Sequence, residues 1–86
     1  MKITITVHTE TNLMLRGIDF LRVQSVIKSP DREEQVHQGR MKARKLFEDK
    51  KEVEVIYKKQ SKNQVIVITA YYLWKFATIK RPILNI

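Results

Sequence analysis

The sequence predicts an α+β fold in which two short helices pack on one face of an antiparallel sheet of about four strands. Three observations predict it. The chain opens with an alternating strand pattern, two sets of helix start and stop residues follow, and the second half carries two β-rich runs joined by a polar link. Because 86 residues leave room for one core, we expect residues 1–86 to form a single domain.

The N-terminal segment reads as a strand followed by a helix. Residues 2–7 alternate apolar and polar side chains, which predicts a strand with one buried face, and His8 follows at its end. Thr9 or Thr11 is expected to cap a short helix through residues 12–16, because a threonine hydroxyl can accept from a free backbone N–H at a helix start.

A second helix is predicted directly after the first. Gly17 is suited to the left-handed conformation that ends a helix. Asp19 is then placed to cap a helix over residues 20–28, whose apolar positions fall on one stripe. Pro30 stops this helix, since the residue before a proline is pushed out of the α region.

The remaining elements are predicted to be strands. Residues 33–37 read as a weak edge strand. Residues 40–47 favour a helix by propensity, but their place between two turns and beside a hairpin favours a strand, and we predict the strand. Residues 53–57 and 65–72 form that hairpin, with residues 58–64 as its loop. The apolar segment 73–79 and the tail at 83–86 are expected to fold back over the sheet or to form a homodimer contact.

The composition excludes several classes of protein. There is no cysteine, which excludes disulfides and thiolate metal sites and fits a reducing cytoplasm. With two histidines and no clustered ligands, we expect no metal and no cofactor. The N-terminus lacks the apolar core of a signal peptide, and no apolar run is long enough to span a membrane, so we expect a cytoplasmic protein.

Net charge separates the two halves of the chain. The total is +8; residues 1–39 hold five basic and five acidic side chains, whereas residues 40–86 hold twelve basic and four acidic ones. This asymmetry predicts a positive face directed at a polyanion such as nucleic acid. The alternative is a lysine-rich surface that serves only solubility or thermal stability.

The available side chains suit metal-independent RNA cleavage. With only two glycines, the chain has no phosphate-binding glycine loop, and it has no nucleophile elbow. RNA cleavage needs an acid, a base and cations, because the 2′-hydroxyl is itself the nucleophile. His8 is the leading candidate for the acid or base, although a histidine at such a junction more often serves to cap or pack. Arg40 and Arg44 are candidate phosphate clamps, or ordinary surface charge.

Other side chains are candidates for binding nucleic acid without chemistry. Aromatic residues could stack on bases, although at strand spacing they are more often core residues. These aromatics are Tyr57, Tyr71, Tyr72 and Trp74. Lysines of the hairpin loop would add non-specific attraction to phosphates. The predicted nucleic-acid-binding residues are Arg40, Lys42, Lys58, Lys59, Lys62 and Tyr71.

Several short motifs resemble those of the RelE/BrnT-type toxins, and more closely a toxin-like family that opens with Thr-x-His. The match runs over roughly residues 4–72. The corresponding residues are Thr6-Val7-His8, Arg16-Gly17-Ile18, Ser29-Pro30, Gly39-Arg40 and Ile68-Thr69-Ala70-Tyr71. The chain departs from BrnT-like sequences in lacking an arginine beside Thr69-Ala70, and its aromatic tail lies outside the pattern.

This resemblance implies two helices on a curved antiparallel sheet, with a ribonuclease-like site on the concave face. Carried over by position, His8, Arg16, Arg44 and Thr69 become the catalytic set, with Tyr71 nearby. It also implies an RNA substrate and a small acidic antitoxin as partners. The alternatives are a non-catalytic nucleic-acid-binding module and an interaction protein that dimerises through its tail.

Overall fold

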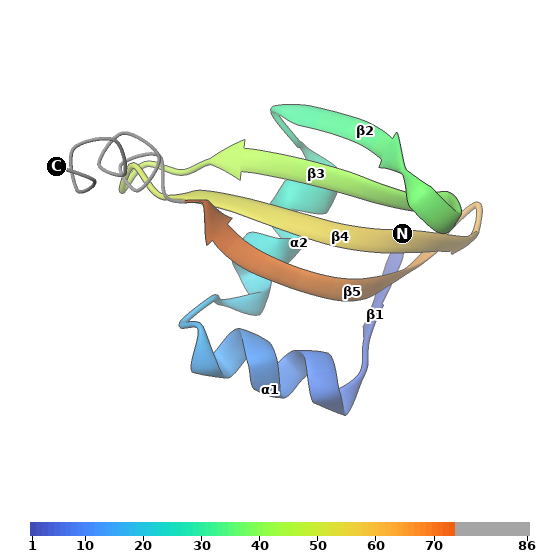
Figure 1. Ribbon diagram of the computed structural model, residues 1–86, viewed down its shortest axis with the longest axis horizontal. Coiled ribbons are helices and arrows are strands. Elements are labelled where there is room, and N and C mark those ends of the chain that lie inside the picture. Colours follow the sequence, from blue (N-terminus) through green and yellow to red (C-terminus); the bar gives the residue numbers. More distant parts are fainter. Residues whose placement is uncertain (74–86) are drawn as a thin grey trace, which may run out of the picture.

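The computed structural model describes residues 1–73, which form a five-stranded sheet and two helices (Figure 1). The strand order is β1-β5-β4-β3-β2. The elements are β1 (Lys2–Ile5), α1 (Val7–Leu15), α2 (Phe20–Lys28), β2 (Arg32–Val36), a short 3-10 turn (His37–Gly39), β3 (Arg40–Leu46), β4 (Glu52–Ser61) and β5 (Gln64–Leu73). The α+β prediction is therefore confirmed, and the predictions for residues 74–79 and 83–86 lie outside the described residues.

The sheet differs from the prediction in one pairing. Strands β2 to β5 are antiparallel neighbours, but β1 pairs with β5 in parallel, so the sheet is mixed and has five strands. This pairing joins residues about sixty positions apart, such as Ile3 and Val65. A strand's alternation shows which face is buried but does not identify its neighbour, so the sequence could not predict it.

The first helix begins earlier than predicted, and the predicted strand over residues 2–7 is too long. The Thr6 hydroxyl accepts from the backbone N–H of Thr9 at 3.2 Å, so Thr6, not Thr9 or Thr11, is the N-cap of α1. As a result Val7 is helical and 79% exposed instead of lying on the buried face of a strand. His8 lies in the first turn of α1 and not at the end of a strand.

Helix α1 covers the part of the β5 edge that β1 leaves unpaired. β1 pairs with β5 only as far as Val67. Beyond it, the Thr9 hydroxyl donates to the carbonyl of Ile68 at 3.1 Å, and Arg16 Nη1 donates to the carbonyl of Ala70 at 2.7 Å. An open strand edge is a site of unwanted pairing, and here side chains of a helix satisfy it.

Thr9→Val is expected to lower the free energy of unfolding by roughly 1–3 kcal/mol, because the part-buried carbonyl of Ile68 loses the donor that the buried Thr9 supplies. Urea unfolding followed by circular dichroism measures this change. Thr11→Val is the matched control on the same helix, because the Thr11 hydroxyl bonds only the exposed carbonyl of Val7. Equal losses in the two variants would contradict a special role for Thr9.

Helix α2 forms as predicted and supplies the core. The Asp19 carboxylate accepts from the N–H of Leu21 at 2.9 Å, and Gly17 has a φ of +68° where α1 ends. Val23 and Val26 are fully buried against β3 and β4. The core consists of Leu13, Ile18, Val23, Val26, Ile27, Ala43, Val53, Val55, Tyr57, Val65, Val67 and Ala70.

The ambiguous segment at residues 40–47 is a strand, β3, as predicted, and β2 is the edge strand beside it. The hairpin loop predicted over residues 58–64 is longer than the observed one. β4 runs to Ser61 and β5 starts at Gln64, so only Lys62 and Asn63 form the turn. Cross-strand pairing with Ile66 and Val65 extends the strand through Lys58 and Lys59, despite their polar character.

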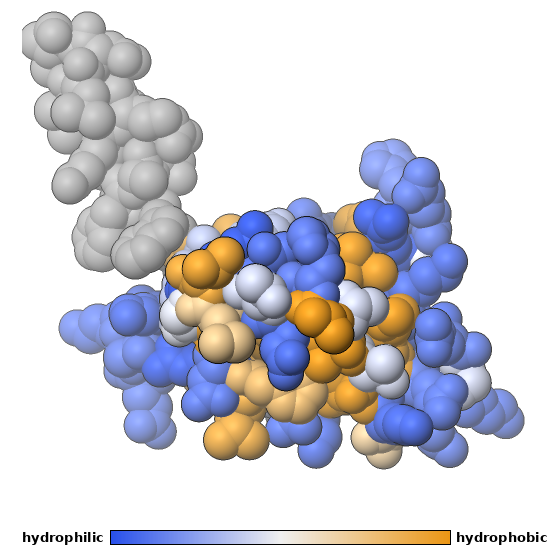
Figure 2. All heavy atoms as spheres, turned by 90° about the horizontal axis from the view of Figure 1, so that it is seen from below, coloured by the Kyte–Doolittle hydropathy of each residue, from blue (hydrophilic) through white to orange (hydrophobic). Residues whose placement is uncertain are grey.

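The outer side of α1 carries apolar side chains. Seen from below the view of Figure 1, they interrupt an otherwise hydrophilic surface (Figure 2). Val7, Met14 and Leu15 of α1 are 75–80% exposed, and Leu21 of α2 is 68% exposed. Helix α1 is therefore apolar toward both the core and the solvent. Within residues 1–73, neither helix has the length and apolar character needed to cross a membrane.

Candidate functional site

The sheet has one face packed on the core and one face that no described helix covers, which we call the open face. Strand register assigns residues to it, because alternate residues point to opposite sides and paired residues share a side. Ala43, Val55 and Ala70 are paired neighbours that face the core. The open face therefore carries the residues between them: Arg32, Glu34 and Val36 of β2; Arg40, Lys42, Arg44 and Leu46 of β3; Glu52, Glu54, Ile56 and Lys58 of β4; and Gln64, Ile66, Thr69 and Tyr71 of β5.

Two of the predicted catalytic residues are in direct contact. Arg16, the C-cap of α1, donates from Nη1 to the hydroxyl of Thr69 at 3.0 Å and to the carbonyl of Ala70. Arg16 is exposed, and these two bonds use a single nitrogen of its guanidinium. Because a guanidinium has five N–H donors, Arg16 retains donors for a ligand while its position is fixed.

A buried carboxylate holds the other predicted residues on the open face. Arg44 Nη2 donates to Glu54 Oε1 at 3.1 Å, and the Tyr71 hydroxyl donates to Glu54 Oε2. The Glu54 side chain is only 4% exposed, so its charge is balanced by Arg44 and not by water. The register makes Arg44, Glu54 and Tyr71 direct neighbours across β3, β4 and β5.

The hydroxyl of Tyr71 is held in its protonated form. Burial raises the pKa of Tyr71 to about 12, and the neighbouring Glu54 carboxylate adds to this shift, while Arg44 and Arg16 oppose it. Tyr71 is therefore a neutral hydrogen-bond donor at physiological pH. Arg16 bonds Thr69, which lies two residues before Tyr71 on the same face of β5.

His8 lies apart from this cluster. It is exposed, and Asn12 Nδ2 lies 3.3 Å from its Nε2. His8, Asn12 and Arg16 follow one another at intervals of four residues along α1. Eight residues of helix separate His8 from Arg16, a rise of about 12 Å. Around the helix axis, His8 and Asn12 are turned further from the buried Leu13 than Arg16 is.

The predicted nucleic-acid-binding residues are divided between surfaces. Arg40, Lys42 and Lys58 lie on the open face, where Lys42 pairs with Glu34 at 3.1 Å. Lys59 is paired with Val65 and so lies on the opposite side, while Lys62 is in the hairpin turn. The described basic residues of the second half therefore do not all share one face.

The aromatic candidates divide in the same way. Tyr57 is a core residue, and its hydroxyl donates to Glu33; burial and that carboxylate raise the pKa of Tyr57. The Tyr72 hydroxyl donates to the carbonyl of Gly17 at 2.9 Å, and Trp74 lies outside the described residues. Among the described aromatic candidates, Tyr71 alone has its side chain on the open face.

Sequence reasoning did not identify Glu54 as part of the site. The only signal was its position, since an acidic residue between Val53 and Val55 interrupts an otherwise apolar strand centre. Its buried state and its two partners depend on register with β3 and β5, which the sequence does not reveal. Within residues 1–73, no group of histidine and acidic residues could hold a metal ion.

The chain shares its fold with a known ribonuclease toxin. A crystal structure of the Brucella abortus ribonuclease toxin BrnT superposes with a TM-score of 0.70, covering 87% of this chain and 99% of that one. The two sequences are 22% identical, so the likeness concerns the fold. No protein-family model and no curated protein matches the sequence. The predicted resemblance to BrnT-type toxins is thus confirmed at the level of the fold.

Proposed function

We propose that this protein is a BrnT-type toxin that cleaves RNA without a metal ion, with the open face as its RNA-binding side. One observation carries the proposal: Arg16 with Thr69, and Arg44 with Glu54 and Tyr71, meet on an uncovered sheet face within a BrnT-like fold. Cations and hydroxyl donors on one surface can stabilise the charge that develops on a phosphodiester during cleavage.

The chemistry follows from the residues at the site. The 2′-hydroxyl of the substrate attacks the adjacent phosphorus, the 5′-oxygen leaves, and a 2′,3′-cyclic phosphate forms. Arg16 would stabilise the extra negative charge on phosphorus by direct contact, and Arg44 would add positive charge from two strands away. The Thr69 and Tyr71 hydroxyls would donate hydrogen bonds. His8 would take the proton from the 2′-hydroxyl and then give it to the departing 5′-oxygen, and RNA bound along α1 would have to bring both oxygens within its reach.

The partners follow from the same surface. The open-face positions of the strands carry Arg32, Arg40, Lys42, Arg44 and Lys58 against Glu34, Glu52 and Glu54. This excess of positive charge favours an RNA strand as substrate and a small acidic antitoxin as inhibitor. An antitoxin on this face would compete directly with RNA.

RNA integrity in cells and in a purified system tests the proposal. Expression of the wild-type protein is expected to arrest bacterial growth, and purified protein with a chelator present should yield fragments ending in a 2′,3′-cyclic phosphate. Arg16→Gln and His8→Ala are expected to reduce cleavage by about a hundredfold each, the usual effect of removing a charge-stabilising donor or an acid–base group.

His37→Ala is the matched control, because His37 is exposed and lies in the 3-10 turn before β3, distant in sequence from His8 and Arg16. It should cleave as the wild type does. If the wild-type protein binds RNA in a salt-sensitive way but leaves the RNA intact, both alone and in the presence of ribosomes, the protein is not an RNA-cleaving enzyme. That result would favour a non-catalytic RNA-binding module.

A further inference from the structure

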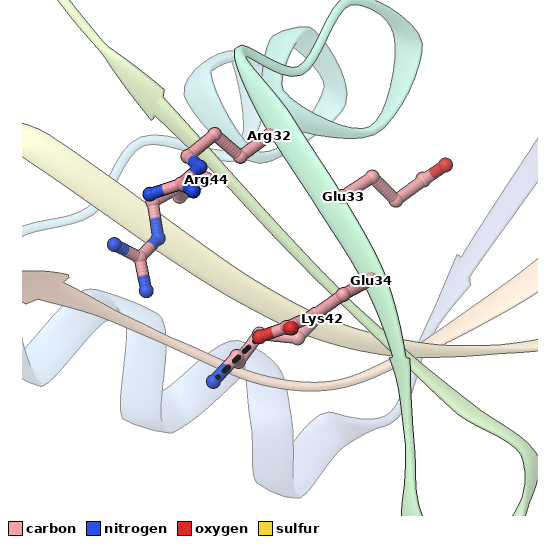
Figure 3. A pocket seen from close by; sticks show the side chains of 5 residues that line it. All are labelled: Arg32, Glu33, Glu34, Lys42 and Arg44. Atoms are coloured by element: carbon pink, nitrogen blue, oxygen red, sulfur yellow. Dashed lines mark ion pairs between the residues drawn. The ribbon is translucent and has the colours of Figure 1, made fainter.

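The outer end of the open face contains an arginine that the proposed chemistry does not use. Arg32 of β2 lies directly opposite Arg44 of β3 in the antiparallel register. Both line a cavity of about 200 Å³ together with Glu33, Glu34 and Lys42. Figure 3 shows the two arginine side chains leaving their strands toward the same side of the sheet, whereas Glu33 points away from them.

The nearby carboxylates are already engaged. Glu34 is paired with Lys42 at 3.1 Å, and Glu54 is paired with Arg44 at 3.1 Å. Glu33 accepts the hydroxyl of Tyr57 on the core side. Within residues 1–73, the structure records no ion pair or hydrogen bond for the Arg32 side chain, which is exposed.

Two like charges directly opposite each other on neighbouring strands destabilise a sheet. Arg44 is partly neutralised by Glu54, but Arg32 has no such partner in the described chain. An anion between the two guanidinium groups would remove this repulsion and accept hydrogen bonds from both. A phosphate group suits the position, because an arginine fork binds two of its oxygens at once.

We propose that Arg32 and Arg44 form a second phosphate subsite, which binds an RNA backbone phosphate next to the one that is cleaved. This inference rests on the proposed function for the identity of the ligand. Arg32, Arg44, Glu54 and Tyr71 form one row across β2, β3, β4 and β5. Three strand spacings, roughly 14 Å, separate the ends of this row, so a single phosphate cannot contact both.

The subsite makes the enzyme dependent on substrate length. A ribodinucleotide, which has one phosphate between its sugars, can occupy the Arg16–Thr69 end but cannot reach Arg32. A longer oligonucleotide can occupy both. Arg32→Gln is therefore expected to raise KM for an RNA of about ten nucleotides by roughly three- to tenfold with kcat unchanged, and to leave dinucleotide cleavage as it is.

Binding of a 2′-deoxy oligonucleotide of the same length tests the subsite without cleavage, because this probe lacks the nucleophile. Arg32→Gln should weaken binding by a similar factor and lower the slope of log Kd against log salt by about 1. Arg32→Lys should restore most of the salt slope. Lys28→Gln is the control, as Lys28 is exposed at the end of α2 and off the open face.

A second readout separates binding from folding. Removing Arg32 relieves the repulsion with Arg44, so the Tm of Arg32→Gln should equal or exceed that of the wild type. Unchanged binding with an unchanged salt slope would overturn the subsite, as would an equal loss in Lys28→Gln. If Arg32→Gln binds the oligonucleotide more weakly but no protein, wild type included, cleaves RNA, the phosphate subsite is supported and the proposed enzymatic activity is contradicted.

Discussion

Replacing Arg44 with glutamine is expected to lower the free energy of unfolding by roughly 2–4 kcal/mol, because the carboxylate of Glu54 stays buried without its cation. The Glu54 side chain is 4% exposed. The Arg44 side chain is 31% exposed, so the expected loss is smaller than the roughly 3–5 kcal/mol seen when a fully buried pair is broken. Urea unfolding at neutral pH measures the change.

Arg40→Gln is the matched control, since Arg40 lies on the same strand and the same face. It should change stability by less than about 0.5 kcal/mol, as is usual for a surface position. The double variant Arg44→Gln with Glu54→Gln should recover much of the loss, because no uncompensated charge remains. An Arg44→Gln protein as stable as Arg40→Gln would show that Glu54 does not need its partner.

The second large effect is the late ionisation of Tyr71. Its pKa is raised from an ordinary value of 10.0 to about 12, so folding favours the protonated hydroxyl. The stability that this group contributes is fully present below pH 10 and is lost as the pH rises toward 12. A titration of tyrosinate absorbance in wild type and in Tyr71→Phe isolates this group as the difference between the two curves.

Glu54→Gln is expected to move the Tyr71 pKa part of the way back toward its ordinary value, since burial, the largest cause, remains. Glu34→Gln is the control, because Glu34 lies on the open face and pairs with Lys42 instead. A Tyr71 that titrates near pH 10 in the wild-type protein would contradict the buried hydrogen bond to Glu54.

The elements that depend on local signals were predictable. Asp19, the apolar stripe of residues 20–28 and Pro30 together define α2, and the structure confirms its bounds. The strand predicted at residues 40–47, and observed as Arg40–Leu46, was predicted from its neighbours against its own propensity. Pairing with β2 and β4 stabilises this strand, which shows tertiary context overriding intrinsic preference.

The errors arise where two local signals compete. Thr6, Thr9 and Thr11 are all suitable caps, and the sequence offers no reason to prefer the first. The Thr9 hydroxyl instead donates to the carbonyl of Ile68 on the β5 edge, and Thr6 caps the helix by accepting from the N–H of Thr9. The hairpin loop was placed too early because lysines at the end of β4 resemble a turn in composition.

The predicted site was partly assembled by the fold. Glu54 joins Arg44 and Tyr71 on the open face, and Arg16 of α1 bonds Thr69 on β5, while the role of these residues as a catalytic set stays a prediction. His8 is exposed along α1 and makes its recorded hydrogen bond to Asn12, so its role stays a prediction. Glu54 and Arg32 were missed because their importance comes from cross-strand neighbours, which one sequence does not reveal.

Helix α1 closes the edge of β5 with the same arginine that the proposed site uses, so the position of this arginine depends on a strand that is synthesised much later. Arg16 finds its partners 53 and 54 residues later in the chain. While β5 is still within the ribosome, the helix has no strand edge to bind and the arginine has no fixed position. The proposed site would therefore take shape only after the last described strand has emerged from the ribosome.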